Sequence, residues 1–175
     1  MNTDEIFQAL NGELKASGLE RHLIICGGAA LIALGVIARE TRDVDVLEPV
    51  LDRALLDAAA RVGRKLGLSD QWLNNGPRAL TETLPKGWQA RCTDLFQGDA
   101  LRIKSLGRLD LIFTKLDAAA SRVDDIRDLV RLKPTPDELA AAEAWALRQD
   151  ASEIWPKIVS ECLAELKKRL GHARR

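Results

Sequence analysis

The chain has 175 residues, 46% of them hydrophobic and 30% charged, which is the composition of an ordinary globular protein with one core. Lys and Arg together number 26, and so do Asp and Glu, so the formal net charge is zero. This balance argues against binding of nucleic acid through bulk positive charge, although a local basic patch would still fit.

The N-terminus and the cysteines indicate a cytoplasmic location. Residues 1–20 are amphipathic and acidic, without the positively charged start and apolar run of a signal peptide. The longest apolar run, residues 29–38, falls far short of the roughly 20 residues that cross a bilayer. The three cysteines show neither CxxC nor Cys/His spacing, so we expect reduced thiols and no structural zinc. We therefore predict a cytoplasmic protein with no membrane partner.

Hydrophobic spacing and helix-breaking residues predict the elements in chain order. Helices are expected at residues 3–17, 29–38, 51–66, 111–122, 123–132, 137–148 and 152–170, and strands at 22–26, 42–47, 88–96 and 101–106. Asn, Gly and Pro mark residues 69–86 as a loop with one short helical turn.

This order of elements indicates the α+β class with an α/β-like core. We predict a small mixed β-sheet with helices packed on one face and a helical C-terminal extension. The core would occupy residues 1–133 and the extension residues 134–175, as parts of the same compact unit.

Asp43 and Asp45 carry the most informative chemistry. Side chains two residues apart on a strand point to the same face, about 6.5–7 Å apart, so these carboxylates would converge while Val44 enters the core. Two carboxylates on one face repel unless a cation lies between them, and Mg²⁺ is commonly held by such a pair together with substrate phosphates. Upstream, Gly27 and Gly28 lie between a strand and a helix, where backbone amides can approach a phosphate closely.

The run CGGAALIALGVIARETRDVDVL, residues 26–47, resembles the signature of the nucleotidyltransferase superfamily with a DNA polymerase β-like core. That signature places Gly-Gly at the end of a strand, then a helix, then Asp-x-Asp on the next strand. The segment TRDVD, which begins at Thr41, is similar to the minimal bacterial branch. The resemblance implies an NTP substrate, Mg²⁺ or Mn²⁺ held by Asp43 and Asp45, and a nucleotide site that includes Gly27, Gly28 and Thr41.

A second segment, DLIFTKLDAAASRVDDIRDLVRL at residues 110–132, resembles bacterial members related to abortive-infection toxins. Their Lys on a helix, followed by Asp-x-x-Asp-Leu, matches Lys115, Asp125 and Asp128. The resemblance places Lys115 and Asp128 among the catalytic residues, and Lys115 and Asp125 in the nucleotide site. A lysine there can reach a triphosphate as a point charge, and the two acids, which share a helix face, can hold the lysine, orient the nucleotide or act as a base. The stretch QWLNNGP at residues 71–77 also resembles a loop of this branch.

The sequence departs from the superfamily in its third metal-binding carboxylate, which active members carry on a later strand. Asp94 is the candidate on predicted strand 88–96, and it alternates with Cys92 and Phe96, so it would face the core side. Asp99 and Asp110 are the other options. If none of them serves, the metal site is partial or the polymerase-like chemistry is lost.

Two functions therefore stay open. One is an Mg²⁺-dependent enzyme that transfers a nucleoside monophosphate from an NTP to an acceptor, which could be a protein, a tRNA end or a small molecule. The other is a weak or inactive component of a toxin–antitoxin or phage-defence pair, with a cognate antitoxin as partner. A generic phosphohydrolase is motivated only by the carboxylate pair. The structural alternatives are an acidic edge strand paired with arginines for Asp43 and Asp45, a solvated lysine for Lys115, and a charged helix face for Asp125 and Asp128.

Overall fold

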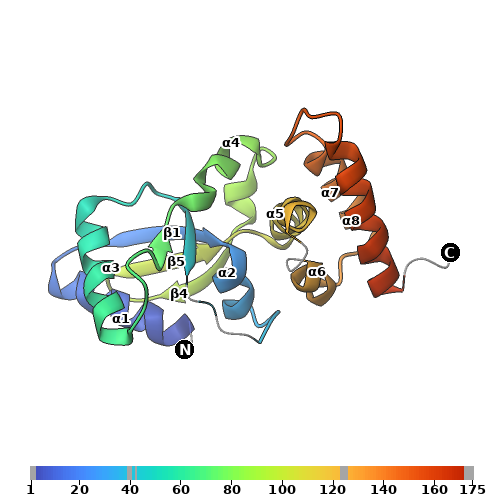
Figure 1. The fold of residues 1–175 in the computed structure, drawn as a ribbon. Helices are drawn as coiled ribbons and strands as arrows, with labels where there is room; N and C mark the ends of the chain where they lie inside the picture. Colours follow the sequence, from blue (N-terminus) through green and yellow to red (C-terminus); the bar gives the residue numbers. More distant parts are fainter. Residues whose placement is uncertain (1–2, 39–40, 42, 123–125, 172–175) are drawn as a thin grey trace. The chain divides into compact units, whose positions relative to one another are not determined.

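The computed structural model describes residues 3–38, 41, 43–122 and 126–171. The chain divides into two units, residues 1–107 and 108–175, whose elements are drawn in Figure 1. Within the described residues, the first unit holds a five-stranded mixed sheet and the second is helical throughout. The predicted α+β class with a helical C-terminal region is confirmed. The predicted boundary between a core and an extension at residue 133 stays a prediction.

The sheet of the first unit has the order β3-β2-β1-β5-β4. Its strands are β1 (Arg21–Cys26), β2 (Val44–Glu48), β3 (Leu73–Asn74), β4 (Thr93–Gln97) and β5 (Leu101–Ser105). The central strand β1 pairs antiparallel with β2 and parallel with β5, which makes the sheet mixed. The short strand β3 adds to β2 in parallel and forms the edge next to the Asp-x-Asp strand.

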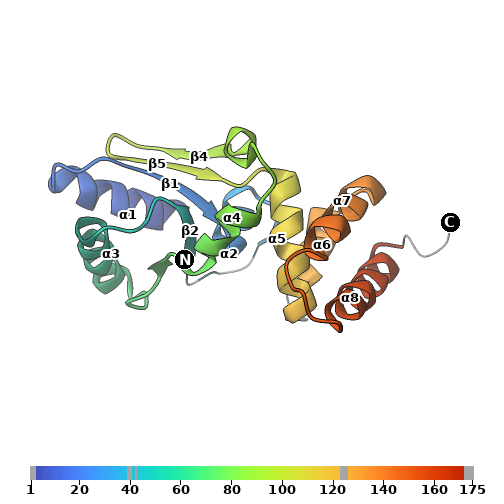
Figure 2. The ribbon, with the colours of Figure 1, turned by 90° about the horizontal axis from the view of Figure 1, so that it is seen from above.

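Helices α1 (Thr3–Ala16) and α3 (Arg53–Leu66) cover one face of this sheet, as Figure 1 and Figure 2 show. Burial follows the period of two on the strands that they cover. Leu23, Ile25, Leu101 and Ile103 are all buried, whereas Arg102 on β5 is exposed on the opposite face. The prediction of helices packed on one face is confirmed, and the other face of the sheet carries polar side chains.

A charged cluster joins α1 to α3. Glu13 of α1 accepts hydrogen bonds from Lys65 and from Arg61, whose Nε lies 2.7 Å from the carboxylate. The hydrogen bonds from Lys65 and Arg61, together with their positive charges, lower the pKa of Glu13 below its ordinary value. The Asp52 side chain caps α3 by accepting from the backbone N–H of Leu55 at 2.8 Å.

The remaining elements of the first unit are short. They are α2 (Gly27–Ala33), the 3₁₀ helix η1 (Gly76–Ala79), α4 (Leu80–Thr83) and the 3₁₀ helix η2 (Trp88–Arg91). The predictions for this part of the chain hold only in part. The predicted helix 29–38 begins two residues earlier and ends at Ala33. The predicted loop 69–86 contains the helical turns η1 and α4, where one turn was expected, and also the strand β3. Residues 88–91 form η2 where a strand was predicted. A strand of two residues and a single helical turn are too short to show a hydrophobic period.

The second unit consists of α5 (Arg108–Ser121), α6 (Ile126–Leu132), α7 (Pro136–Ala146) and α8 (Trp155–Leu170). Thr135 and Glu138 form a capping box at the start of α7. The Glu138 carboxylate also accepts two hydrogen bonds from the guanidinium of Arg108, at 2.8 and 3.1 Å. Phe113 stacks on Trp145 with ring centroids 5.6 Å apart. Among the helices of the described residues, none is long and apolar enough to cross a membrane.

One acid of the second unit lies in an unfavourable environment. Burial, and secondarily the negative charge of Asp150, raise the pKa of Asp117 above its ordinary value. Asp117 lies on α5, and its ionised form is therefore less stable in the folded chain than in water.

Candidate functional site

The Asp-x-Asp segment lies at the start of β2, with its acids directed away from the core. Val44 and Val46 are buried, whereas Asp43 is exposed and Asp45 is partly exposed. Because side chains alternate along a strand, this pattern puts the two carboxylates on the side opposite to the valines. The buried Thr41 donates from its hydroxyl to the Asp43 carboxylate at 3.0 Å and to the Asp43 backbone carbonyl at 3.2 Å, which restrains the first acid.

Gly27 lies directly against the second acid. It follows Cys26, the β1 residue that pairs with Asp45, and it begins α2 with a φ of +69°. A Cβ atom at position 27 would stand only 2.4 Å from Asp45 Oδ2. The absence of a side chain is therefore what lets the carboxylate lie over the strand-to-helix junction. Gly28 is the second residue of α2. The structure therefore places Gly27 beside Asp45, and the role of the two glycines in a nucleotide site stays a prediction.

Asn74 on β3 contacts Asp45 from the other side. The two residues are register partners of the parallel β2–β3 pair. Asn74 Nδ2 donates to Asp45 Oδ1 at 3.2 Å, and Asn74 Oδ1 accepts from the backbone N–H of Gly76 at 2.8 Å. The Asp45 carboxylate is therefore held between a glycine on one flank and an amide on the other.

Lys115 and Asp128 form a buried ion pair in the second unit. Lys115 Nζ on α5 lies 2.7 Å from Asp128 Oδ2 on α6, and the side chains are 8% and 7% exposed. Of the roles considered for these acids, holding the lysine is the one that this geometry shows for Asp128. Asp125, the other acid of the segment, lies outside the described residues.

Asp94 is not brought to the Asp-x-Asp segment. It lies on β4, and β5 and β1 stand between that strand and β2, so the separation is roughly 14 Å at the usual strand spacing. The register of the β4–β5 pair shifts between Asp94 and Phe96. This bulge breaks the alternation from which a core-facing Asp94 was inferred, and the side chain instead forms an ion pair with Lys104 at 3.4 Å.

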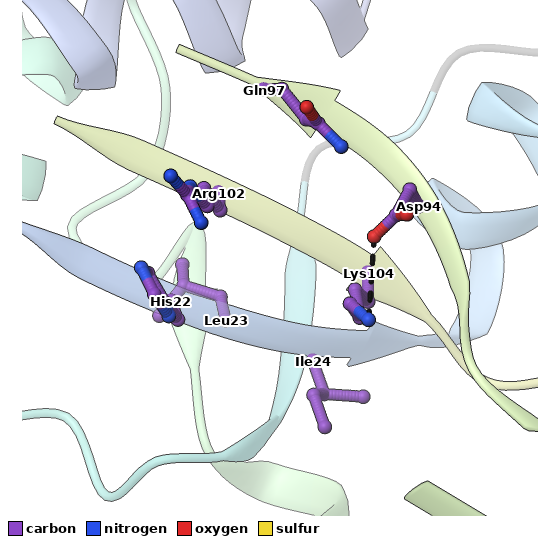
Figure 3. A pocket seen from close by; sticks show the side chains of 7 residues that line it. All are labelled: His22, Leu23, Ile24, Asp94, Gln97, Arg102 and Lys104. Carbon is purple, nitrogen blue, oxygen red and sulfur yellow. Dashed lines mark ion pairs between the residues drawn. The ribbon is translucent and has the colours of Figure 1, made fainter. Parts of the chain in front are cut away.

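Asp94 also lines a hollow of about 490 Å³ on the uncovered face of the sheet. The lining residues come from β1, β5 and β4 and are shown in Figure 3: His22, Leu23, Ile24, Asp94, Gln97, Arg102 and Lys104. Asp99 is paired with Lys15 on the surface of the same unit, and Asp110 is fully buried within α5.

A family model described as "nucleotidyltransferase of unknown function (DUF6036)" matches residues 3–133, well over half of the chain. The chain belongs to this nucleotidyltransferase family. Comparison with curated proteins and with solved structures gives no match.

The family match places all of the predicted site residues within the nucleotidyltransferase segment, because it runs through α5 and α6 to residue 133. Membership implies a nucleotide substrate. Across the residues described, no group of three or more His, Cys, Asp or Glu side chains is arranged to hold a metal ion.

Sequence reasoning missed two features of this nucleotidyltransferase. The sequence marks Asn74 only as part of a loop, because its contact with Asp45 spans 29 residues of sequence. The cations on the uncovered face could have been found from β5, where LRIKS alternates buried Leu101, Ile103 and Ser105 with exposed Arg102 and Lys104.

Proposed function

We propose that this nucleotidyltransferase transfers a nucleoside monophosphate from an NTP to an acceptor hydroxyl, with Mg²⁺ or Mn²⁺ held by Asp43 and Asp45. The observation that carries the proposal is the position of Asp45. Its carboxylate lies over Gly27, where the strand-to-helix junction would bring triphosphate and carboxylates together. The family match, which covers this segment, supports the same reaction class.

The donor set fits a divalent cation. Carboxylate oxygens are the ligands that Mg²⁺ prefers, and it usually keeps waters and substrate phosphates as its other ligands, so two protein carboxylates suffice. The Gly27 position leaves open the space that a Cβ would fill beside Asp45 Oδ2. When bound, such a cation neutralises phosphate charge and favours in-line displacement. Thr41 keeps the Asp43 carboxylate oriented, so less ordering is needed on binding.

The nucleotide would be held by the start of α2 and by Thr41, with backbone amides of Gly27 and Gly28 approaching the phosphates. We further propose that Lys115 neutralises charge that develops during transfer. Since Lys115 is buried against Asp128, this role requires its ammonium to exchange that carboxylate for a phosphate. Asp128 would then set the resting position of the lysine, and Asp125 is proposed to orient the nucleotide.

Nucleotide binding can be tested by thermal unfolding with Mg²⁺ and each NTP in turn. A ligand present at 100 times its dissociation constant adds about 2.7 kcal/mol of stability. We expect a Tm rise that needs both Mg²⁺ and the NTP and that disappears in Asp43→Ala/Asp45→Ala. Glu153→Ala, which removes an exposed acid of the second unit, is the control and should keep the rise.

Transfer itself is tested with an NTP labelled at the α-phosphate, offered with protein, tRNA and small-molecule hydroxyl acceptors. The label should move to one class of acceptor and should stay on the nucleotide with Asp43→Ala. Undiminished transfer by that variant would refute the assignment of Asp43.

A second function is favoured by the residue beside Asp45. An amide stands there where a further acid would strengthen a metal site, and the described residues hold no three-acid group. On this basis the second candidate function is that of a weak or inactive component of a toxin–antitoxin or phage-defence pair. Co-purification with the product of an adjacent gene, together with no Tm response to any NTP in that complex, would favour this function over transfer.

A further inference from the structure

Asn74 faces Asp45 from the neighbouring strand, and its amide has one orientation. The backbone N–H of Gly76 can only donate, so the Asn74 atom 2.8 Å away must be the carbonyl oxygen. The NH₂ group is then the atom 3.2 Å from Asp45 Oδ1. Asn74 is therefore a fixed donor to a carboxylate that we assign to the cation, rather than a second acceptor for that cation.

The backbone that carries Asn74 is anchored. Trp72 is 1% exposed, and its indole N–H donates to the Ala59 carbonyl at 2.9 Å. Val44 N–H donates to the Trp72 carbonyl at 2.5 Å, which ties the start of β2 to the residue before β3. A Cβ at Gly76 would stand 2.9 Å from Asn74 Oδ1, so the turn is built closely around the amide. Asn74 cannot swing away from Asp45 without disturbing this edge of the sheet.

We propose that Asn74 is a positioning residue that orients Asp45 and keeps the negative charge of the site low. As a consequence, the divalent cation binds together with the nucleotide phosphates and not before them. This inference rests on the proposed function of Asp43 and Asp45. Cation affinity in oxygen-ligand sites follows the number of charged ligands. Two carboxylates, one of them already accepting from an amide, bind a cation weakly until phosphate oxygens complete its coordination.

The inference predicts opposite effects for two substitutions at one position. Asn74→Asp keeps an acceptor for Gly76 N–H but turns a carboxylate oxygen toward Asp45 Oδ1. The like charges repel without a cation, so this variant should unfold at lower temperature in chelator and should bind a cation more tightly. Asn74→Ala removes the donor without adding charge, so it should only weaken binding.

Asn75 offers a matched control on the adjacent residue. Its amide donates to the carbonyls of Val46 at 2.8 Å and Pro49 at 3.1 Å and accepts from Leu51 N–H at 2.8 Å, so these three bonds all go to backbone groups. Asn75→Asp makes the same chemical change as Asn74→Asp and loses the same kind of donor. It should lower the Tm without a gain in cation affinity.

The experiment is a Mn²⁺ titration of the full chain, followed by the electron paramagnetic resonance signal of free Mn²⁺, with and without a non-hydrolysable NTP analogue. For the wild type we expect the analogue to tighten Mn²⁺ binding at least about tenfold, because it completes the ligand set. Asn74→Asp should bind Mn²⁺ alone at least about tenfold more tightly than the wild type. Asn74→Ala should lose about 10- to 100-fold in affinity when the analogue is present, as expected for a group that orients a ligand.

The inference is overturned if Asn74→Asp binds Mn²⁺ alone no more tightly than the wild type, or if Asn75→Asp shows the same gain. Failure of the proposed function looks different, since the analogue would then lower free Mn²⁺ only by its own chelation, to the same extent with any variant as without protein. The comparison of Asn74→Asp with the wild type in Mn²⁺ alone still decides the role of Asn74 in that case. Should Asn74→Asp be unfolded in chelator, its refolding by Mn²⁺ supports the inference and its failure to refold refutes it.

Discussion

Replacing Gly27 by alanine tests the contact on which the site is built. The substitution has two costs that can be separated. The first is backbone strain, because Gly27 has a φ of +69° and a side chain there costs about 1–2 kcal/mol. The second is the overlap of the new Cβ with Asp45 Oδ2 at 2.4 Å. Ordinary contact begins at 3.4 Å, so the carboxylate would have to withdraw by about 1 Å.

Gly35 supplies a matched measure of the strain alone. Its φ is +70°, and a Cβ there meets nothing within 4 Å. Gly35→Ala should therefore lower the free energy of unfolding by about 1–2 kcal/mol. Gly27→Ala should cost that amount and a further 1–3 kcal/mol, roughly the usual penalty for forcing an extra methyl group into a filled space. Denaturant unfolding of both variants gives the difference directly.

A double-mutant cycle with Asp45→Ala identifies the colliding group. Removing the carboxylate should cancel the additional cost, so that Gly27→Ala in that background costs no more than Gly35→Ala. The coupling free energy is then about 1–3 kcal/mol and is stabilising for the double variant. If Gly27→Ala costs the same with and without Asp45, the carboxylate does not lie over Gly27 and the proposed site loses its central observation. The Mg²⁺-NTP Tm rise should also be lost in Gly27→Ala and kept in Gly35→Ala.

Three further outcomes are expected from the ionisable groups. Glu13→Gln should lower the free energy of unfolding by about 1 kcal/mol at pH 7. Because the pKa of Glu13 is lowered in the folded chain, this difference should shrink as the pH falls below the unfolded value of 4.5 and disappear below the folded pKa. Asp117→Asn should act in the opposite sense, since burial and then Asp150 raise the pKa of Asp117. Between pH 3.8 and the folded pKa, the folded chain keeps a proton on Asp117 that the unfolded chain loses, so the wild type loses stability as the pH rises through this range. The variant should therefore have the higher Tm at pH 7 but not at pH 3. Lys115→Met should cost about 3–5 kcal/mol by urea unfolding, because it leaves a buried charge that has lost its ion pair, and Lys115→Met/Asp128→Leu should recover most of that cost.

The sequence predicted the elements whose evidence is local. Helix 3–17 was expected from Ile6, Leu10 and Leu14 on one face, and α1 spans Thr3–Ala16 with all three buried. The alternation of acids and valines over residues 43–46 likewise predicted which of these side chains enter the core, because a period of two can be read from a few residues.

Features that depend on pairing between distant strands were not predictable in the same way. Strand β3 has two residues, and only its pairing with β2 makes it a strand. Asn74 therefore carried no local signal of its contact with Asp45. Asp94 shows the converse error, since its alternation with Phe96 was read correctly from the sequence but a register shift on β4 turned the side chain to the other face. A bulge is set by the neighbouring strand and leaves no periodicity of its own.

Stability alone gives a poor account of the Lys115–Asp128 pair. Taking both charges out of water costs several kcal/mol per ion, and well-packed apolar replacements of buried pairs are often as stable or more stable. At 8% and 7% exposure, the pair thus adds little net stability, although either partner alone is costly to remove. Its position inside the segment matched by the nucleotidyltransferase family is consistent with a role in the reaction. The variant Lys115→Met/Asp128→Leu separates the two accounts. The comparison is made once the Tm of this variant is near that of the wild type. If the pair is only structural, the variant should transfer label normally. If Lys115 is catalytic, the variant should be stable but should have lost transfer.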